Sequence, residues 1–384
     1  MRPTMTYLDD GSIRTVETIL ASQNSRRPFV VYDETAYVSS GAQAALQSTF
    51  ANRATTWFSQ FELNPKLPDV EQGVELFRKS QSDVIVAIGG GTAIDIAKLI
   101  AALSQQTDPA AAIIRGERPL ADFDIPLIAI PTTAGTGSEA THFAVVYIQN
   151  EKFSLAHPHI LPQFTIVDSQ LTRSLPRSIT AATGLDAFCQ AIESLWAVGS
   201  TDQSIAYASE ALPLIVENLP IAVLAPTAKS RRGMSRAAHL AGKAINISRT
   251  TAPHAISYAI TSRHGFPHGV AVAMTLSRML KYNASVQAAD CADPRGVSFV
   301  QRQIDRIVDL LASQTLEEAS QKIDSFIAKL GCPTSLQAAG INTRPQIEAI
   351  VQQVNAERMS NNPRSSTSAT LLDLLAGGVS AVTS

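Results

Sequence analysis

The stretch DVIVAIGGGTAIDIAKLIAAL, residues 83–103, decides the fold of the first half of the chain. Its opening apolar run, residues 84–88, has no polar alternation and therefore predicts a strand that is buried on both faces. After three glycines, apolar side chains recur at helical spacing, which predicts an amphipathic helix. A buried strand, a glycine turn and a helix in succession indicate an open α/β sheet that is covered by helices.

Segments on both sides of this stretch continue the alternation of strand and helix. Upstream, we predict strands over residues 27–33 and 55–61 and helices over 41–52 and 70–80. Downstream, buried strands are predicted over 126–130 and 164–168. Between them, FAVVYIQ and KFSLAH alternate like a hairpin around Asn150 and Glu151.

From about residue 178, long segments with an apolar period near 3.6 replace the short strand-like runs. This change predicts two domains, an α/β domain over residues 1–175 and an all-helical domain over residues 176–384. The helical segments are predicted over 179–198, 202–219, 231–247, 243–269, 299–313 and 316–330, with a last short helix after the polar segment that begins at residue 361.

The composition is that of a globular chain of 384 residues, 45% hydrophobic and 17% charged. A net charge of -2 offers no basic face for nucleic acid or for an anionic membrane. Three scattered cysteines, Cys189, Cys291 and Cys332, indicate a reducing compartment without disulfides. We see no signal peptide and no apolar run that approaches membrane-spanning length, so we expect a cytoplasmic protein.

The glycine turn is a candidate phosphate site. Gly89, Gly90 and Gly91 lie between a strand and a helix, where backbone amides can approach a phosphate closely. Thr92 and Asp95 resemble a capping box that would fix the start of the helix. The spacing fits neither the P-loop nor the usual dinucleotide fingerprint. A tight turn without a ligand explains one glycine but explains three in succession poorly.

A second loop of small residues, PTTAGTGSE over residues 131–139, also follows a buried strand. Its hydroxyls and glycines would suit a dinucleotide laid across the strand ends, although a plain surface loop is the better interpretation of this segment taken alone. Two such loops favour a nucleotide. Asp33, at the end of an earlier strand, either accepts hydrogen bonds from a ribose or caps a helix. The candidate cofactor contacts of this loop are Thr132, Thr133, Thr136, Gly137 and Ser138.

A candidate metal site combines residues from two distant segments. Asp186 and Gln190 are four residues apart and share one helical face. Asp186 sits among apolar residues, where an unpaired carboxylate is costly, so a metal or an arginine must satisfy it. His254 and His268 would add two imidazoles. A structural salt bridge for Asp186 and solvated histidines are the competing interpretation.

The motifs GGGTAIDIAK, PTTAGTGSEAT and GLDAFCQAIE, followed by the histidine pair, resemble the iron-containing (group III) alcohol dehydrogenase family. The similarity extends over residues 27–364 and includes NNPR near the end. It implies a Rossmann-like N-terminal domain, an all-α C-terminal domain of the dehydroquinate synthase-like fold, and a homodimer. It also implies a divalent metal, Fe²⁺ or alternatively Zn²⁺, and NAD(H) in preference to NADP(H) because of Asp33.

The same resemblance assigns roles to individual residues. It places the pyrophosphate at the glycine turn, includes Lys98 at the end of GGGTAIDIAK among the cofactor contacts, and makes Asp186, His254 and His268 metal ligands. Gln190 stands where the family usually has a histidine ligand. Tyr258 stands where many members have a second histidine that relays a proton, so Tyr258 is the candidate catalytic donor.

A third departure from the family concerns the substrate. Lys243 occupies a position that is commonly apolar, and it precedes His254 by eleven residues, which would place both on one face of one helix. With Arg249 or Arg263, Lys243 would hold an anionic substrate, unless these charges simply meet solvent. The segments HFAVVYIQNEKFSLAHP and GKAINISRTTAPHAISY resemble the branch of the family that reduces phosphonoacetaldehyde to 2-hydroxyethylphosphonate.

Three other functions stay open at this point. The chain could be a general alcohol or aldehyde dehydrogenase for small neutral or hydroxylated substrates. It could be an enzyme without a metal, like maleylacetate reductase. The loss of a histidine at Gln190 also allows a catalytically inactive nucleotide-binding protein.

Overall fold

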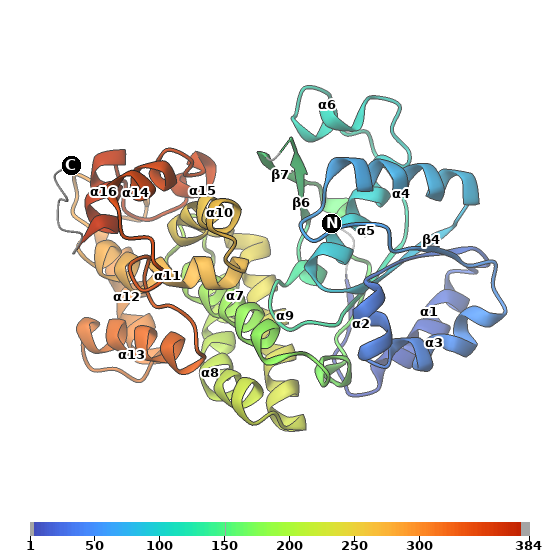
Figure 1. The fold of residues 1–384 in the computed structure, drawn as a ribbon, viewed down its shortest axis with the longest axis horizontal. Helices are drawn as coiled ribbons and strands as arrows, with labels where there is room; N and C mark the ends of the chain where they lie inside the picture. Colours follow the sequence, from blue (N-terminus) through green and yellow to red (C-terminus); the bar gives the residue numbers. More distant parts are fainter. Residues whose placement is uncertain (1–3, 150, 378–384) are drawn as a thin grey trace. The chain divides into compact units, whose positions relative to one another are not determined.

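The structure is a computed structural model that describes residues 4–149 and 151–377. The chain forms two compact units, Met1–Leu175 and Pro176–Ser384. In Figure 1 the first unit runs from blue to green and the second from green to red. The first contains a parallel sheet with helices, whereas every regular element described in the second is a helix. The predicted fold class, an α/β domain followed by an all-helical one, is confirmed.

Six strands of the first unit form one parallel sheet in the order β1-β8-β5-β4-β2-β3. Parallel neighbours need crossover connections, which is why helices separate these strands in the sequence. The strands are β1 (Met5–Tyr7), β2 (Pro28–Tyr32), β3 (Thr56–Phe58), β4 (Val84–Gly89), β5 (Leu127–Pro131) and β8 (Phe164–Ile166). The predicted strand over 55–61 is shorter than expected because β3 is an edge strand that pairs with β2 alone.

The helices of the first unit follow the predictions over residues 41–52, 70–80 and the stretch after the glycines. The sequence did not predict β1, α1, α2 or α6, which are all short. The helices are α1 (Thr15–Ser22), α2 (Glu34–Ser39), α3 (Ala42–Ala51), α4 (Leu67–Ser80), α5 (Gly91–Leu103) and α6 (Ala110–Ile114), with 3-10 turns η1 (Ser12–Arg14), η2 (Ser138–Ala140), η3 (Pro158–Ile160) and η4 (Ser169–Thr172).

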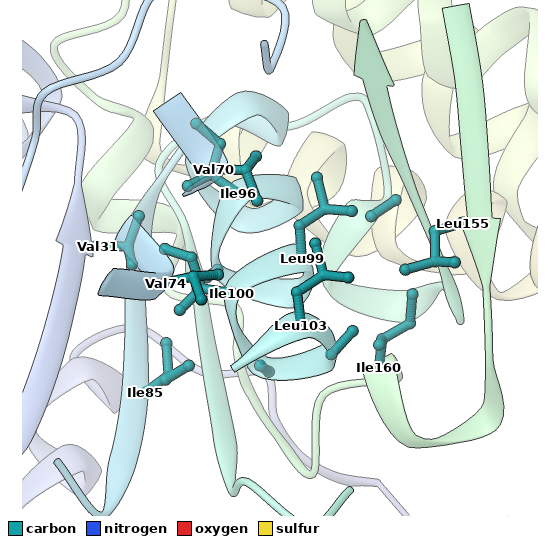
Figure 2. Close-up of a cluster of buried hydrophobic side chains, with 14 of the residues drawn as sticks. Val31, Val70, Val74, Ile85, Ile96, Leu99, Ile100, Leu103, Leu155 and Ile160 are labelled. Carbon is teal, nitrogen blue, oxygen red and sulfur yellow. The ribbon is translucent and has the colours of Figure 1, made fainter. Parts of the chain in front are cut away.

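Strand β4 is buried along its whole length, as its apolar run predicts. On one face of the sheet, Ile85 belongs to a core cluster with Val74 of α4 and Ile100 of α5, which Figure 2 shows. On the other face, Val86 packs with residues of α1 and α3, among them Leu20. Helices therefore cover both faces of the sheet, and this burial holds the carboxyl ends of the strands in a fixed row.

The predicted hairpin forms a separate two-stranded antiparallel sheet of β6 (Phe143–Ile148) and β7 (Glu151–Ala156). Glu151 pairs with Ile148 and belongs to β7, whereas Asn150, the other predicted turn residue, lies outside the described residues. Alternate residues of β6 are buried, so one face of the hairpin packs on the core that contains α5.

The second unit contains helices at the predicted segments, including the last short one. Its helices are α7 (Arg177–Trp196), α8 (Asp202–Leu224), α9 (Ala228–Ser248), α10 (Ala252–His264), α11 (His268–Ala284), α12 (Val297–Leu310), α13 (Leu316–Lys329), α14 (Arg344–Val351), α15 (Ala356–Ser360) and α16 (Ser368–Ala376). The single helix predicted over 243–269 is divided among α9, α10 and α11. The sequence did not predict α14, α15 or the part of α11 after residue 269.

The expectation that Lys243 and His254 share one helix is wrong. Helix α9 ends at Ser248, and α10 begins four residues later at Ala252. Arg249 between them has φ 60 and ψ 177, a backbone conformation that a helix cannot contain. Pro253 in the first turn of α10 explains the restart, because proline is favourable there and unfavourable inside a helix.

Helix α8 corrects the expectation that no apolar run approaches membrane-spanning length. Among the described residues it is the one helix long and apolar enough to cross a membrane by length and composition. It packs against both α7 and α9, and 50% of its apolar window is buried. We interpret α8 as a core helix of the second unit, since core helices meet the same criteria.

Helices α7 and α11 approach closely at Gly269. A Cβ on Gly269 would lie 2.0 Å from the carbonyl oxygen of Ala182 and 2.9 Å from Cβ of Asp186. Helix α11 begins at His268, so the contact that seats Gly269 on α7 also brings His268 to Asp186. The glycine is therefore required by packing.

We expect Gly269→Ala to lower the free energy of unfolding by about 3 kcal/mol, because the new methyl group meets backbone that cannot yield. Helix propensity alone would instead make alanine stabilising by about 1 kcal/mol. Urea unfolding measures the difference. Gly265→Ala is the control, since Gly265 has φ 72 and open space around it, and only the ~1 kcal/mol cost of a left-handed alanine is expected. A stabilised Gly269→Ala protein would contradict this packing.

Candidate functional site

Three loops of the first unit meet at the carboxyl edge of the sheet. They follow β2, β4 and β5, which are neighbours in the sheet. The backbone N–H of Asp33 donates to Ile88 O at 3.0 Å, and that of Thr132 donates to Gly89 O at 2.9 Å. In open α/β sheets this edge is where nucleotides bind. The tertiary fold thus brings together the loops that the sequence identified separately.

The three glycines allow these loops to approach. A Cβ on Gly91 would lie 2.9 Å from Thr136 Oγ1, and one on Gly90 would lie 3.4 Å from Thr133 Cγ2. Gly89 has φ 159, and a Cβ there would lie 2.7 Å from Ala93 Cβ. Since α5 begins at Gly91, the backbone amides of its first turn face this crowded edge. Such a cradle fits a phosphate group.

A buried hydroxyl in the second loop also fits a cofactor. Thr132 is 1% exposed, and its Oγ1 has no hydrogen-bond partner among the described residues. Buried hydroxyls are normally paired, so an unpaired one at this edge is the feature expected where a polar ligand binds. The contacts of Thr133, Thr136, Gly137 and Ser138 with a cofactor stay predictions.

The predicted capping box of Thr92 and Asp95 is wrong. Helix α5 has Gly90 as its N-cap, and no side chain caps it. Asp95 instead accepts hydrogen bonds from Ser138 Oγ and, at 3.0 Å, from the backbone N–H of Val145. Thr92 lies two residues after the N-cap, too far into the helix to cap it, and its Oγ1 accepts from the backbone N–H of Asn64 at 3.4 Å. Asp95 therefore fastens the second loop to α5.

Lys98 lies beside Asp95 and is fully buried. Its Nζ donates to Ser138 Oγ at 3.1 Å, to Thr141 Oγ1 at 3.0 Å and to Phe143 O at 2.9 Å. An ammonium group has three donors, and here all three face protein atoms. These contacts favour a role in holding the second loop in place, while a direct contact of Lys98 with a cofactor stays a prediction.

Burial changes the ionisation of this pair. It lowers the pKa of Lys98 to about 8, although the carboxylates of Asp95 and Glu139 act in the opposite direction. Burial also raises the pKa of Asp95, against the attraction of Lys98. A buried pair of this kind is costly unless its remaining hydrogen bonds are satisfied, and Ser138 and Val145 satisfy them.

Asp33 acts as a helix cap, one of its two predicted roles. It is the N-cap of α2, and its Oδ1 accepts the backbone N–H of Ala36 at 2.7 Å. A carboxylate has lone pairs left for a second donor, so the cap does not prevent a hydrogen bond to a ribose. That second role stays a prediction.

The predicted metal ligands come together in the second unit. One ligand atom each of Asp186, His254 and His268 lies within 4.8 Å of the other two. His254 Nε2 is 3.3 Å from Asp186 Oδ1. The rings of His254 and His268 are 5.3 Å apart at 71°. One carboxylate and two imidazoles around one point fit a divalent cation such as Fe²⁺ or Zn²⁺.

Glu193 orients the histidine, and the sequence analysis missed it. Its Oε1 lies 2.5 Å from His254 Nδ1, so Nδ1 donates to Glu193 and Nε2 faces Asp186, where loss of the Nε2 proton would leave a lone pair for a metal. Its Oε2 accepts from the backbone N–H of Thr251 at 2.7 Å and from Thr251 Oγ1 at 2.9 Å. Glu193 could have been found by the argument used for Asp186, because it too is an acid in a mostly apolar segment, AIESLW over residues 191–196.

The electrostatics of this cluster require a positive charge. Asp186 is 4% exposed and Glu193 is 0% exposed. Burial alone would lower the pKa of His254, but these two carboxylates outweigh it and raise that pKa to about 10. A divalent cation between the Asp186 and His254 side chains would meet the same requirement as the proton that it displaces. The residues present therefore fit a metal.

Gln190 and Tyr258 lie on the elements that carry the ligands. Gln190 is buried on α7, one turn after Asp186 and one turn before Glu193, so the three share a helix face. The ring of Tyr258, on α10, stacks on that of His268 with centroids 6.1 Å apart. Gln190 as a ligand and Tyr258 as a proton donor stay predictions.

The three predicted cationic substrate contacts lie on different parts of the second unit. Lys243, on α9, is half-buried, and its Nζ lies 4.2 Å from the centre of the Tyr207 ring. Arg249 is the exposed residue at the end of α9. Arg263 is exposed in the last turn of α10, where it donates to Gln353 at 2.9 Å. Their contact with a substrate stays a prediction.

Known proteins resemble the chain over nearly its whole length. Residues 3–169 match the family described as iron-containing alcohol dehydrogenase, and residues 180–378 match the C-terminal part of the Fe-containing alcohol dehydrogenase family. Phosphonoacetaldehyde reductase of Streptomyces viridochromogenes is 38% identical over 313 residues, which are 78% of this chain and 77% of that protein. Long-chain-alcohol dehydrogenase 1 of Geobacillus thermodenitrificans is 32% identical over 72% of this chain and 70% of that protein.

A solved structure extends the similarity to the whole fold. Sulfoacetaldehyde reductase from Bifidobacterium kashiwanohense, crystallised in complex with NAD⁺, has a TM-score of 0.88 with this chain and 28% identity. The match covers 100% of this chain and 98% of that one.

We expect Asp186→Ala and His254→Ala to abolish both bound metal and activity, because each removes a ligand and leaves an opposite charge buried. Elemental analysis of the purified protein and NADH oxidation with an aldehyde measure the two losses together. Asp202→Ala, at an exposed position on α8, is the control and should keep both. Full activity in metal-free wild-type protein would rule out this assignment.

We expect Glu193→Gln to bind a divalent metal roughly tenfold more weakly than the wild type. The amide preserves the shape of the side chain but removes its negative charge. The electrostatic attraction that is lost is larger for a dication than for the single proton with which it competes. Competition against a chromogenic chelator gives the affinity. Unchanged affinity would show that the negative charge of Glu193 does not contribute to metal binding.

Proposed function

Because the chain belongs to the iron-containing alcohol dehydrogenase family, we propose that it reduces an anionic aldehyde, most specifically phosphonoacetaldehyde to 2-hydroxyethylphosphonate. The protein is an oxidoreductase of the alcohol dehydrogenase and aldehyde reductase class. One observation carries the proposal: ligand atoms of the buried Asp186 and His254 and of the partly buried His268 lie within 4.8 Å of one another. This arrangement argues against the metal-free and the catalytically inactive alternatives.

The bound groups supply the reactive chemistry. Fe²⁺, or alternatively Zn²⁺, held by Asp186, His254 and His268 would polarise the aldehyde carbonyl as a Lewis acid. NADH, bound at the glycine turn and the second loop, would supply the hydride. We favour NAD(H) over NADP(H) because the Asp33 carboxylate at the edge of the sheet would repel a 2′-phosphate.

The protein's own residues position these groups and handle the proton. Glu193 holds His254 in the tautomer that presents Nε2, so the ligand does not have to reorient for each turnover. Asp95 and Lys98 hold Ser138 and with it the second cofactor loop. The stacking of the Tyr258 ring on that of His268 supports Tyr258 as the proton donor for the product alcohol.

The packing of α7 against α9 supports Lys243 as the anion contact. Arg231 NH1 donates to Thr180 Oγ1, 51 residues away, and Ser194 and Ser248 pair across 54 residues, so the two helices run parallel. Interpolation along the two helix axes between these contacts gives Lys243 the same height as Gln190, about one turn from the height of Asp186.

Two relatives are named for aldehydes that carry an anionic tail, a phosphonate and a sulfonate. A cation near the ligands is the feature that such a tail requires. The general alcohol dehydrogenase alternative draws on the 32% identical long-chain-alcohol dehydrogenase, whose name denotes uncharged substrates. We further propose a cytoplasmic homodimer, on the family resemblance and the three free cysteines.

We expect Lys243→Ala to raise KM for phosphonoacetaldehyde at least tenfold, because a charge-assisted contact of ~1.5–3 kcal/mol is lost. KM for a neutral aldehyde of similar size should change less than twofold. Steady-state NADH oxidation measures both. Lys229→Ala is the matched control, since Lys229 lies on the same helix but is exposed and pairs with Glu217.

A panel of phosphonoacetaldehyde, sulfoacetaldehyde and an uncharged aldehyde, run with NADH and NADPH, tests the substrate class directly. A preference for the anionic aldehydes that Lys243→Ala removes would support the proposal. Equal effects of Lys243→Ala on charged and neutral aldehydes would overturn the anion site and favour a general alcohol dehydrogenase.

A further inference from the structure

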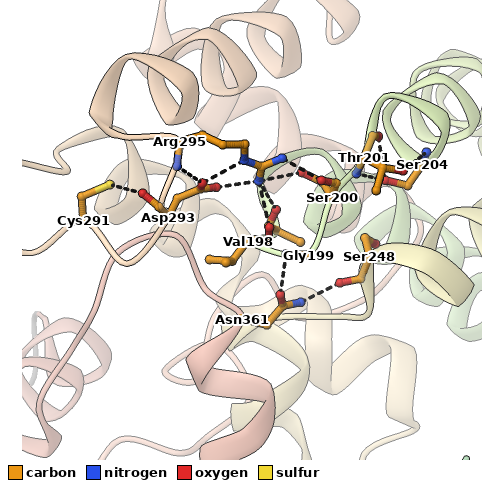
Figure 3. A network of polar contacts seen from close by, with 11 residues as sticks. Val198, Gly199, Ser200, Thr201, Ser204, Ser248, Cys291, Asp293, Arg295 and Asn361 are labelled. Carbon is orange, nitrogen blue, oxygen red and sulfur yellow. Dashed lines mark hydrogen bonds and ion pairs between the residues drawn. The ribbon is translucent and has the colours of Figure 1, made fainter.

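Asn361 belongs to the NNPR segment, which the proposed reaction does not use. Its side chain bridges two connections between helices, as Figure 3 shows. Nδ2 donates to Ser248 O at 2.8 Å and to Thr250 O at 3.0 Å, and Oδ1 accepts the backbone N–H of Gly199 at 2.9 Å. Both donors of the amide are therefore used on the connection between α9 and α10.

The two carbonyls that Asn361 binds flank Arg249. Arg249 has φ 60 and ψ 177, a region of backbone space that only glycine normally occupies. Such a conformation persists where the surrounding structure imposes it, and conformations of this kind cluster at functional sites. The amide of Asn361 supports it here by binding the carbonyl before Arg249 and the carbonyl after it, while Ser248 Oγ donates to Arg249 O at 3.0 Å.

The turn to which Asn361 ties this connection is itself held rigidly. Arg295 donates to the carbonyls of Ala197, Val198 and Ser200 at 2.7 to 3.1 Å, and Asp293 pairs with its guanidinium at 2.6 Å. No side chain would fit at Gly199, where a Cβ would lie 2.9 Å from Ser248 O. The turn after α7 is thus a fixed anchor for the connection between α9 and α10.

The connection leads directly into the metal-ligand cluster. Thr251 follows Thr250, donates twice to Glu193 and accepts from Trp196 Nε1 at 2.8 Å. His254 lies three residues later in the first turn of α10 and shares Glu193 with Thr251. A displacement of the connection would therefore move Thr251, Glu193 and His254 together.

We propose that Asn361 is a positioning residue for the metal centre, because it fixes the strained connection that places His254 and its partner Glu193. The inference rests on the proposed metal site but not on the identity of the substrate. It gives the C-terminal segment a function in metal binding, although Asn361 lies 107 residues after His254 in the sequence.

The test is the affinity of purified, metal-stripped protein for Co²⁺, followed by the visible absorption of the bound ion. In Asn361→Asp, a carboxylate oxygen faces two carbonyl oxygens, and we expect roughly tenfold weaker Co²⁺ binding and an altered spectrum. Asn361→Ala removes the donors without introducing repulsion and should also bind Co²⁺ more weakly than the wild type. It provides the test if the Asn361→Asp protein does not fold.

Asn362→Asp is the matched control. Asn362 is buried and exchanges hydrogen bonds with Asn283 at 2.8 and 3.2 Å, away from the connection, so its loss should lower Tm and leave Co²⁺ affinity within twofold. Wild-type affinity in Asn361→Ala, or an equal loss in Asn362→Asp, would overturn the inference. Failure of the wild-type protein to bind Co²⁺ would instead overturn the proposed metal centre itself.

Discussion

The carboxylates of Asp186 and Glu193 are buried on one face of α7 and need a positive charge nearby. Several contacts in the second unit place His254 where it can supply that charge or bind a cation. Asp186 and Glu193 are both shielded from water, so each needs a cation or several donors. His254 contacts both, with Nδ1 toward Glu193 and Nε2 toward Asp186. A metal ion at Nε2 preserves this charge balance. The constraint that shapes the metal-free protein is thus the same one that makes a metal site.

Close backbone contacts bring the site residues within reach of one another. Gly269 lets the start of α11 lie directly on α7, which delivers His268 to Asp186. At the sheet edge, Gly91 lets the start of α5 meet Thr136 in the same way. In both units a glycine allows the close approach, because protein interiors are densely packed and a larger side chain would not fit at these contacts.

The structure divides the polar residues of the motifs into those with a polar atom that has no partner within the described part of the chain and those that bind other residues of the protein. Thr132 has a buried hydroxyl without a partner among the described residues, as a ligand contact should. Asp95 and Lys98, from the neighbouring motif, use their hydrogen bonds on Ser138 and the start of the hairpin. Asn361 and Glu193 likewise use their hydrogen bonds on other residues, here around the candidate metal ligands. Many motif residues therefore hold other site residues in place and do not themselves face a ligand.

The sequence by itself determined the fold class, the loops at the sheet edge and Asp186 as a buried acid, because apolar periodicity, glycine runs and an acid amid apolar residues are local signals. The two histidines were assigned as metal ligands through the family motifs. The tertiary structure alone decided that Lys243 and His254 lie on separate helices, that Asp95 braces a loop instead of capping a helix, and that Glu193 orients the histidine. Each of these depends on a partner between 43 and 61 residues away or on a backbone conformation such as that of Arg249, and neither leaves a periodic trace in the sequence.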